Sequence, residues 1–371
     1  MKKFLTRLFA VITIFATLAY FISCLTPYIS PVTFWPMAFF ALGFPYLAVV
    51  IIILAISWLF VKRKYALFLL LLLFAGFQNL FATFALNPSA PKDSAKEPTS
   101  LRILTWNVRG FDNPGFSADS GTSIRKRMYD YIKKTNPDVM CFQEFAEHLF
   151  PGVSSNTKEL QKLGYIYYYR TDELPHRYVY GTILTGSAIF SKVPIINRGQ
   201  IRLGDSSYQE HLVYTDVMLQ NQKVRIFTTH FKSINLFAKP EDSDNKVIFH
   251  GDSNFVYRST QFEKLKVFGQ DHARQSLIVK KALNASPFPV VFTGDLNSVP
   301  TSYPYHMISS GLQDAFRLSG WGLGTTLDSL PKTLRIDFFF ADKRLRITNY
   351  RKDDLPLSDH FPQIVDIGLQ E

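Results

Sequence analysis

Long apolar runs dominate the first quarter of the chain. Three of them, Phe4–Ser23, Phe34–Phe60 and Tyr65–Leu86, reach or exceed the ~20 residues that a helix needs to cross a bilayer. We therefore expect three transmembrane helices. The first run also fits the apolar part of a signal peptide, but no clear small-residue cleavage site follows it and two further spans come after it.

After the third run the pattern changes. Residues 87–100 are rich in Pro, Ser and Ala and predict a flexible linker. From residue 101 onward, short runs rich in β-branched and aromatic residues are typical of strands. The candidates are LRILTWN, DVMCFQE, YIYYYR, GSAIFS, LVYTDVML, KVRIFTTH, PVVFTGD, LRIDFFFA and FPQIVDIGL. The pattern predicts a membrane domain over 1–86, a linker over 87–100 and a folded domain over 101–371.

Two helices in this domain are marked by apolar residues spaced three or four apart. The first is capped by Thr122 or Ser123, and the second, around His272–Leu283, is expected to turn Leu277 and Ile278 inward. So many strands with so few helices do not fit a doubly wound parallel sheet. They favour an α/β fold built as a four-layer α/β/β/α sandwich of two mixed, largely antiparallel sheets.

The charge distribution gives the membrane part an orientation. The whole chain carries a net charge of +11, and its first hundred residues contribute +6 of that, from eight basic and two acidic residues. The basic residues that flank the spans are Lys2, Lys3, Arg7, Lys62, Arg63 and Lys64. Because basic flanks stay in the cytoplasm, three crossings deliver the folded domain to the outer side of the membrane. The remaining +5 is only a mild indication of an anionic substrate.

Polar side chains recur where predicted strands end or begin. A lone Gly294-Asp295-Leu296-Asn297 would fit a turn, but six segments of the domain share this pattern. Each polar group loses hydration beside its buried apolar run unless it finds partners, so we expect the group to meet at one rim of the sandwich. The candidate site residues are Asn107, Glu144, His230, Asp295, Asn297, Asp337, Asp359 and His360.

The oxygen ligands in this group indicate a hard cation. Glu144, Asp359 and the amide of Asn107 suit Mg²⁺, Mn²⁺ or Ca²⁺ rather than Zn²⁺. A divalent cation of this kind stabilises the charge that develops on a phosphoryl group under attack.

The remaining members of the group supply proton transfer and phosphate binding. Asp295 is a carboxylate able to activate water, and Asn297 can hold a phosphate oxygen or orient that carboxylate. His230 and His360 can donate to a phosphate or move a proton. Together with the cation, these residues predict hydrolysis of a phosphoester.

The series of motifs resembles the endonuclease/exonuclease/phosphatase superfamily, over about residues 101–367. The motifs follow one another in the expected order: WNVRG, FQE, GSAIFSK, TTH, TGDLN, RIDFFF and SDH. Each is weak alone, but the series is specific. The resemblance implies a deoxyribonuclease-like fold and a Mg²⁺-dependent phosphodiesterase.

The resemblance also implies a role for each matching residue. Glu144 would bind the cation with Asn107 beside it, and Asp359 would contribute at a second position. Asp295 would orient or deprotonate the attacking water, and Asn297 would hold the phosphate.

On the phosphate side, His360 would contact the phosphate while paired with Asp337, which orients the imidazole and favours its protonated form. His230 would act as a second acid or phosphate donor, and Arg109 would add a phosphate contact. The apurinic endonuclease branch has an acid at the position of Arg109, which argues against repair of abasic sites. A carboxylate that supports His230 is not evident, and the candidates are Asp172 and Glu173.

The function expected from these features is a nuclease-like phosphodiesterase, tethered to the outer side of the cytoplasmic membrane. A lipid head-group phosphodiesterase or phosphatase is the alternative, because a short linker favours substrates near the membrane. A catalytically inactive binding module on three helices is a further hypothesis of another class. The partners expected are a nucleic acid or lipid phosphoester and the bilayer, and no protein partner can be inferred. The stretch over residues 234–268 is interpreted as an insertion that faces the substrate.

Overall fold

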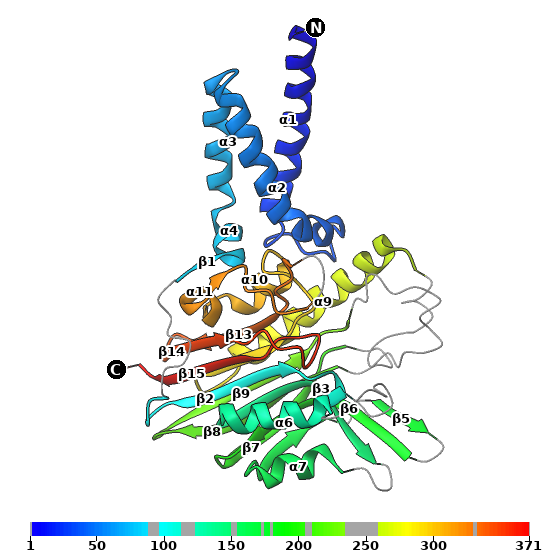
Figure 1. The fold of residues 1–371 in the computed structure, drawn as a ribbon, viewed down its shortest axis with the longest axis vertical. Helices are drawn as coiled ribbons and strands as arrows, with labels where there is room; N and C mark the ends of the chain where they lie inside the picture. Colours follow the sequence, from blue (N-terminus) through cyan, green and yellow to red (C-terminus); the bar gives the residue numbers. More distant parts are fainter. Residues whose placement is uncertain are drawn as a thin grey trace.

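A group of apolar helices stands on one side of a larger α/β domain (Figure 1). The computed structural model describes residues 2–87, 96–112, 123–149, 154–171, 174–178, 181–204, 210–233, 259–328 and 332–370. Most of the predicted insertion, residues 234–258, lies outside the described residues, as do Asp172 and Glu173. Residues 261–268 of that stretch are helical, so the predicted insertion extends too far at its C-terminal end.

Two of the apolar helices, α1 (Lys2–Cys24) and α2 (Pro36–Leu59), are long and apolar enough to cross a membrane. The third predicted span is not one continuous helix. It is divided into α3 (Arg63–Ala75) and α4 (Phe77–Thr83), which meet at an angle of 62°. The described residues therefore contain two uninterrupted candidate spans, or three if the bent pair counts as one.

The break at Gly76 has a local cause. A Cβ atom at this position would collide with the hydroxyl group of Tyr20 on α1, so only glycine permits the close approach. Beyond the bend, the amide of Asn79 is buried and donates to the backbone carbonyl of Ser23 at 3.0 Å. This polar contact fixes the direction of α4 and ends the apolar run that predicted one straight helix.

Two mixed sheets form the α/β domain, which confirms the predicted sheet architecture. Among the described residues, the first sheet has the order β11 (Leu312–Asp314), β13 (Asp337–Asp342), β10 (Val290–Asp295), β9 (Gln222–His230), β8 (His211–Leu219) and β7 (Ile195–Arg202). The second has the order β14 (Leu345–Lys352), β15 (Gln363–Leu369), β2 (Leu101–Asn107), β3 (Val139–Leu149), β6 (Gly181–Ser191) and β4 (Tyr167–Arg170), with β5 (Leu174–Tyr178) also paired to β6. The pairs β9–β10 and β2–β3 are parallel, and the others are antiparallel.

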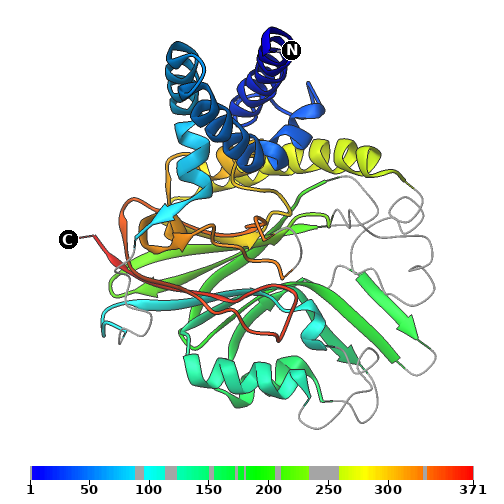
Figure 2. The same ribbon diagram turned by 45° about the horizontal axis from the view of Figure 1, so that its top comes forward.

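The sheets pack face to face over a shared core. Alternate residues of β2 point in opposite directions: Ile103 enters the core between the sheets, whereas Leu104 and Trp106 enter the core beneath the outer helices. Cys141 is buried in the same inner core. The outer faces of both sheets are covered by helices (Figures 1 and 2).

Helices α6 (Ile124–Thr135) and α7 (Asn156–Lys162) lie on the outside of the second sheet, and α9 (Gln261–Asn284), α10 (Tyr303–Ser309) and α11 (Ala315–Ser319) lie on the side of the first. Ser123 caps α6 as predicted, accepting from the backbone N–H of Lys126. On α9 the prediction for Leu277 was wrong, because the helix buries Ser276 and Val279 and leaves Leu277 exposed. Only Ile278 packs partly against the core.

The apolar helices are hydrogen-bonded to the α/β domain. Thr301, in the loop after β10, donates from its hydroxyl group to the carbonyl of Ala41 on α2 at 2.7 Å. Its own carbonyl accepts from the hydroxyl of Thr26, just after α1, at 2.7 Å. Thr26 and Thr301 are both buried.

A second group of contacts joins α4 to the domain. The buried guanidinium of Arg335 donates to the carbonyl of Ala82 at 2.7 Å and pairs with Asp314 at 3.0 Å. Strand β1 (Ala85–Leu86) then pairs with β12 (Trp321–Gly322). Both ends of the predicted linker touch the domain: Asn87 bonds the carbonyls of Arg317 and Gly320, and Lys96 pairs with Asp138. Residues 88–95 are outside the described residues, so the linker stays a prediction.

Candidate active site

The polar ends of several strands converge at one rim of the two sheets. Within the first sheet, the register places Asp295 of β10 beside His230 of β9 on one side and Asp337 of β13 on the other. Within the second sheet, Asn107 ends β2, which runs parallel to β3. The parallel pair in each sheet directs its carboxyl ends to the same rim, so residues distant in sequence come together there.

Glu144 reaches this rim through an irregularity in β3. The register shifts between Phe142 and Phe145, and Glu144 takes a left-handed backbone conformation with φ of 49°. The extra residue keeps Phe142 and Phe145 in the same outer core and releases the Glu144 side chain towards the rim. A positive φ is strained for a residue with a Cβ atom, and such strain is often found at functional sites.

The amide of Asn107 links the carboxylates of Glu144 and Asp295. Its Nδ2 donates to Oε1 of Glu144 at 3.0 Å and to Oδ2 of Asp295 at 3.1 Å. Its Oδ1 accepts from the backbone N–H of Arg109 at 3.1 Å. Burial, reinforced by the nearby charge of Asp359, raises the pKa of Glu144. The positive charges of His360 and Arg109 lower this pKa but do not offset the rise.

Asp295 lies at the centre of the cluster and is buried. Its Oδ1 accepts from the backbone N–H of Asn297 at 2.8 Å. Nε2 of His230 and Nε2 of His360 lie 3.5 Å and 3.6 Å from its Oδ2. Burial, with the charge of Asp337 added, raises the pKa of Asp295 to about 8, although the charge of His360 opposes the rise.

His360 is paired with Asp337 as the resemblance implied. Nδ1 of the imidazole lies 2.9 Å from Oδ2 of Asp337, which leaves Nε2 directed towards Asp295. Burial disfavours the charged imidazolium, but the carboxylates of Asp337, Asp295 and Asp359 outweigh it and hold the pKa of His360 well above its usual value. The indole of Trp106 anchors the segment by donating to the carbonyl of His360 at 2.9 Å.

His230 and Asn297 form the other side of the cluster. Nε2 of His230 lies 3.5 Å from Oε1 of Glu144 and 3.2 Å from Nδ2 of Asn297. Asn297 also donates from Nδ2 to the carbonyl of Phe231 at 2.8 Å. Both candidate carboxylate partners for His230, Asp172 and Glu173, lie outside the described residues, so that expectation stays a prediction.

Asp359 and Arg109 occupy the exposed edge of the site. Nε of Arg109 lies 3.8 Å from Oδ2 of Asp359, and the two side chains are 59% and 41% exposed. Arg109 begins the short turn α5 (Arg109–Asp112) with a positive φ. Such an exposed, loosely paired guanidinium remains able to contact an anion from solvent.

The ligand set fits a hard divalent cation. Asp295, Asp337 and His360 offer ligand atoms that all lie within 4.8 Å of one another. Because Nδ1 of His360 is already paired with Asp337, we interpret this trio as a hydrogen-bonded relay. Glu144 and Asp359, whose charges interact, also offer oxygen atoms that could hold a cation.

Two residues that hold the site in place carried no role in the sequence analysis. Ser358 donates from its hydroxyl group to the carbonyl of Asn107 at 2.9 Å. Arg335 precedes Asp337 in the RIDFFF motif and connects it to α4. The sequence could have indicated this role of Arg335, because a lone arginine among apolar residues predicts a buried charge that needs a partner.

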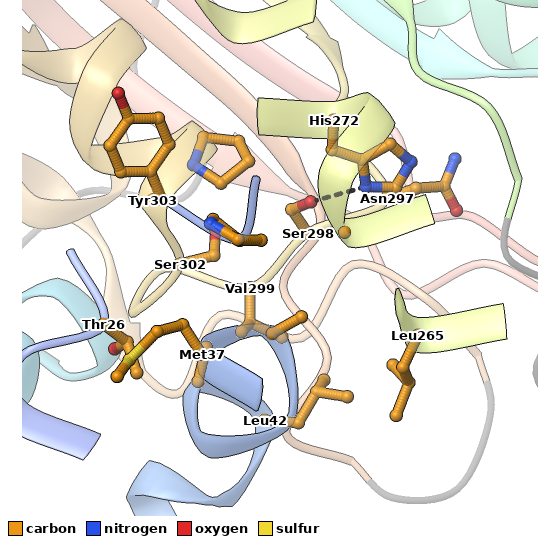
Figure 3. A pocket seen from close by; sticks show the side chains of 15 residues that line it. Thr26, Met37, Leu42, Leu265, His272, Asn297, Ser298, Val299, Ser302 and Tyr303 are labelled. Atoms are coloured by element: carbon orange, nitrogen blue, oxygen red, sulfur yellow. Dashed lines mark hydrogen bonds between the residues drawn. The ribbon is translucent and has the colours of Figure 1, made fainter. Parts of the chain in front are cut away.

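An apolar cavity lies between α2 and the loop that follows β10 (Figure 3). It is lined by Met37 and Leu42 of α2, Leu265 of α9 and Val299, and it shares only Asn297 with the predicted site residues. The cavity is therefore separate from the polar cluster.

Comparisons with known proteins agree with this arrangement. The family model described as Endonuclease/Exonuclease/phosphatase family matches residues 104–360. A second model, described as a domain of unknown function, matches residues 6–83. No curated protein matches the chain.

Solved structures show the same fold at low identity. An endonuclease/exonuclease/phosphatase from Beutenbergia cavernae DSM 12333 has 20% identity, over 73% of this chain and 72% of that one, with a TM-score of 0.50. The human Nocturnin catalytic domain has 17% identity, over 75% and 97% of the two chains, with a TM-score of 0.51. A family protein from Bacteroides thetaiotaomicron has 17% identity, over 74% and 100%, with a TM-score of 0.50.

Proposed function

Because the chain belongs to the endonuclease/exonuclease/phosphatase family, whose members are hydrolases, we propose that it hydrolyses a phosphodiester with the aid of a divalent cation. One observation carries the proposal. The part-buried carboxylate of Glu144 and the buried one of Asp295 share the amide of Asn107, and both lie 3.5 Å from the same nitrogen of His230. Such a close group of ionisable side chains away from water is expensive in a purely structural role.

The cation, proposed to be Mg²⁺, would be held by Glu144 and Asp359, with Asn107 fixing the carboxylate of Glu144. Oxygen ligands and partial exposure on the Asp359 side suit an ion that keeps part of its water shell. When bound there, the cation supplies positive charge that lowers the pKa of Asp295 and neutralises charge on the phosphoryl oxygens.

Asp295 is proposed to accept the proton of the attacking water. Its Oδ1 is fixed by the backbone N–H of Asn297 and its Oδ2 by the amide of Asn107, and a carboxylate oxygen that accepts one hydrogen bond can accept another from the water. A base works best when its pKa is near the working pH, and the raised pKa of this carboxyl group fits that need once a cation is nearby. The water oxygen then forms the new bond to phosphorus.

The two histidines are proposed to complete the displacement. His360, kept protonated by Asp337, donates from Nε2 to a phosphoryl oxygen, and Asn297 and Arg109 add further donors. As the bond between phosphorus and the leaving oxygen breaks, His230 supplies the proton that the leaving oxygen needs.

Hydrolysis of bis-p-nitrophenyl phosphate by the purified full chain tests this proposal. We expect turnover with Mg²⁺ that EDTA abolishes and that Asp295→Ala lowers by at least about a hundredfold. Turnover that is insensitive to both changes would refute the mechanism. Absence of turnover in the unaltered chain would instead favour the inactive binding module.

The catalytic domain is proposed to lie outside the cytoplasmic membrane. The end of α1 that contacts the domain is opposite the end that carries Lys2, Lys3 and Arg7 (Figure 1). The basic connection between α2 and α3 also lies at the end remote from the domain. With basic ends in the cytoplasm, the bent α3–α4 pair would make the third crossing.

Two classes of phosphodiester are candidate substrates, nucleic acids and lipids. A nucleic-acid backbone fits the nuclease-like set of residues around His230. The hydrogen bonds of Thr301 to the membrane helices favour a lipid head group instead, because they hold the catalytic loop close to the bilayer. Hydrolysis rates on plasmid DNA and on phospholipid vesicles, measured side by side, discriminate between them.

A further inference from the structure

We propose that the catalytic domain rests on the bilayer through a face of its own, separate from the spans. This bilayer-contact face is formed by the start of α9, with Phe262 and Lys266, and by α11 and β12, with Arg317, Leu318 and Trp321. The expected partner is the head-group layer of the leaflet nearest the domain. The face would fix the height and tilt of the domain above the membrane.

The exposure of two large side chains is the first indication. The side chains of Phe262 and Trp321 are 60% and 63% exposed, although neither is needed to fill the core. Leu277 is also exposed on α9, whereas Ile196 is exposed on β7, a strand farther from the spans (Figure 1). An exposed apolar surface beside the spans favours lipid as its partner over water.

One side-chain contact and one strand pairing place these residues near the apolar helices. The ring centroid of Phe262 lies 6.0 Å from that of Phe39 on α2. Trp321 pairs in register with Leu86, three residues after the end of α4. The two aromatic side chains therefore mark separate points around the base of the helical group.

The length of α2 indicates how close the α/β domain lies to the bilayer. The carbonyl of Ala41 is bonded to Thr301 of the domain. From Ala41 to the end of α2 at Leu59 the helix is about 28 Å long at 1.5 Å per residue. A hydrocarbon core is ~30 Å thick. Almost all of α2 beyond Ala41 is therefore needed to cross the hydrocarbon core. The face of the domain nearest the apolar helices must then lie in the interfacial layer.

The chemistry of the face suits that layer. Aromatic side chains are enriched where hydrocarbon meets head groups, and basic side chains bind anionic lipids. Lys266 is one helical turn from Phe262, and the exposed Arg317 is four residues before Trp321. Each aromatic residue thus has a cation nearby that can contact lipid phosphate.

The depth of the domain also fixes the distance of the catalytic loop, between β10 and α10, from the bilayer. Asn297 precedes Thr301 by four residues, which limits their separation to ~14 Å. Given the proposed function, the phosphates nearest to the site would be those of lipid head groups in this leaflet.

Depth measurement on the full chain in phospholipid vesicles tests the face. Single cysteines are introduced by Phe262→Cys and Trp321→Cys and labelled with an environment-sensitive fluorophore. Ile196→Cys is the matched control, because Ile196 is 48% exposed and lies on the remote β7. The native Cys24 and Cys141 are buried, and the unaltered chain gives the labelling background.

With lipids that carry a quencher below the head group, we expect about a twofold or greater loss of fluorescence at positions 262 and 321 and almost none at 196. Equal, weak quenching at all three positions would overturn the proposal. The readout requires no turnover, so a failure of the proposed hydrolysis leaves this test unaffected.

Discussion

Single carboxylates control the protonation of the catalytic cluster. The clearest case is Asp337, whose charge offsets the effect of burial on His360. We expect Asp337→Asn to lower kcat on bis-p-nitrophenyl phosphate at pH 7 by roughly 10²- to 10³-fold, because the neutral amide no longer favours the imidazolium. His360→Ala serves as the comparison. If the two residues act as a unit, the double variant loses no more than either single one.

The pH profile of the Asp337→Asn variant gives an independent readout. A raised pKa keeps His360 protonated at neutral pH, and the charge is lost only as pH rises through that pKa. Removing Asp337 lowers the pKa, so the alkaline limb of kcat should move to lower pH. An alkaline limb at the same pH in both proteins would contradict the assigned pair.

His272 affects stability without belonging to the cluster. It is buried, with Nε2 2.8 Å from the carbonyl of Lys232 and Nδ1 2.9 Å from the hydroxyl of Ser298, and burial lowers its pKa to about 4. The unfolded chain therefore binds a proton that the folded chain rejects between pH 6.5 and about 4. The stability is full above pH 6.5 and falls by about 3 kcal/mol as the pH is lowered through this window.

His272→Gln checks this effect, since glutamine can keep both hydrogen bonds but does not titrate. The midpoint of thermal unfolding should fall less between pH 7 and pH 5 in the variant than in the unaltered protein. An identical fall in both would show that other groups cause the acid sensitivity.

At the scale of elements, the loop between β10 and α10 connects catalysis to the membrane helices. It begins at Asp295 and is bonded to α2 through Thr301. Thr301→Val keeps the shape of the side chain but removes the hydroxyl group. We expect this change to lower the stability by about 1–2 kcal/mol and to lower kcat. Thr301→Ser keeps the donor, and near-normal values for it would attribute the loss to the hydrogen bond.

The strand ends were predictable because their chemistry is local. An apolar run that stops at Asn107, His230 or Asp295 carries both the strand and the polar group in adjacent residues, and the register then brings those groups together. The bend at Gly76 was not predictable from the apolar run. It depends on Tyr20 and Asn79, whose contacts join helices distant in sequence.

The attachment of the apolar helices to the domain could not be predicted from the sequence either. Thr26 and Thr301 are 275 residues apart, and threonine is too common to indicate a partner. Hydrophobicity predicted the spans, and the order of the motifs predicted the site residues. Neither pattern predicts the contact between the apolar helices and the α/β domain. That contact shows that the α/β domain is packed directly against the apolar helices.

At the scale of the whole molecule, the proposed orientation across the membrane can be tested directly. The hydrogen bonds of Thr26, Ala41 and Ala82 to the α/β domain lie at the end of the apolar helices remote from the basic residues. If the helices cross the membrane as proposed, the domain and the connection between α2 and α3 are on opposite sides. In intact cells, a membrane-impermeant maleimide should label Met218→Cys on β8 but not Phe60→Cys beside the basic connection. Both side chains are exposed in the structure. Because lipid can also cover position 60, its labelling in permeabilised cells is the necessary control. Permeabilised cells should label both variants. Labelling of Phe60→Cys alone in intact cells would reverse the orientation and move the catalytic site into the cytoplasm.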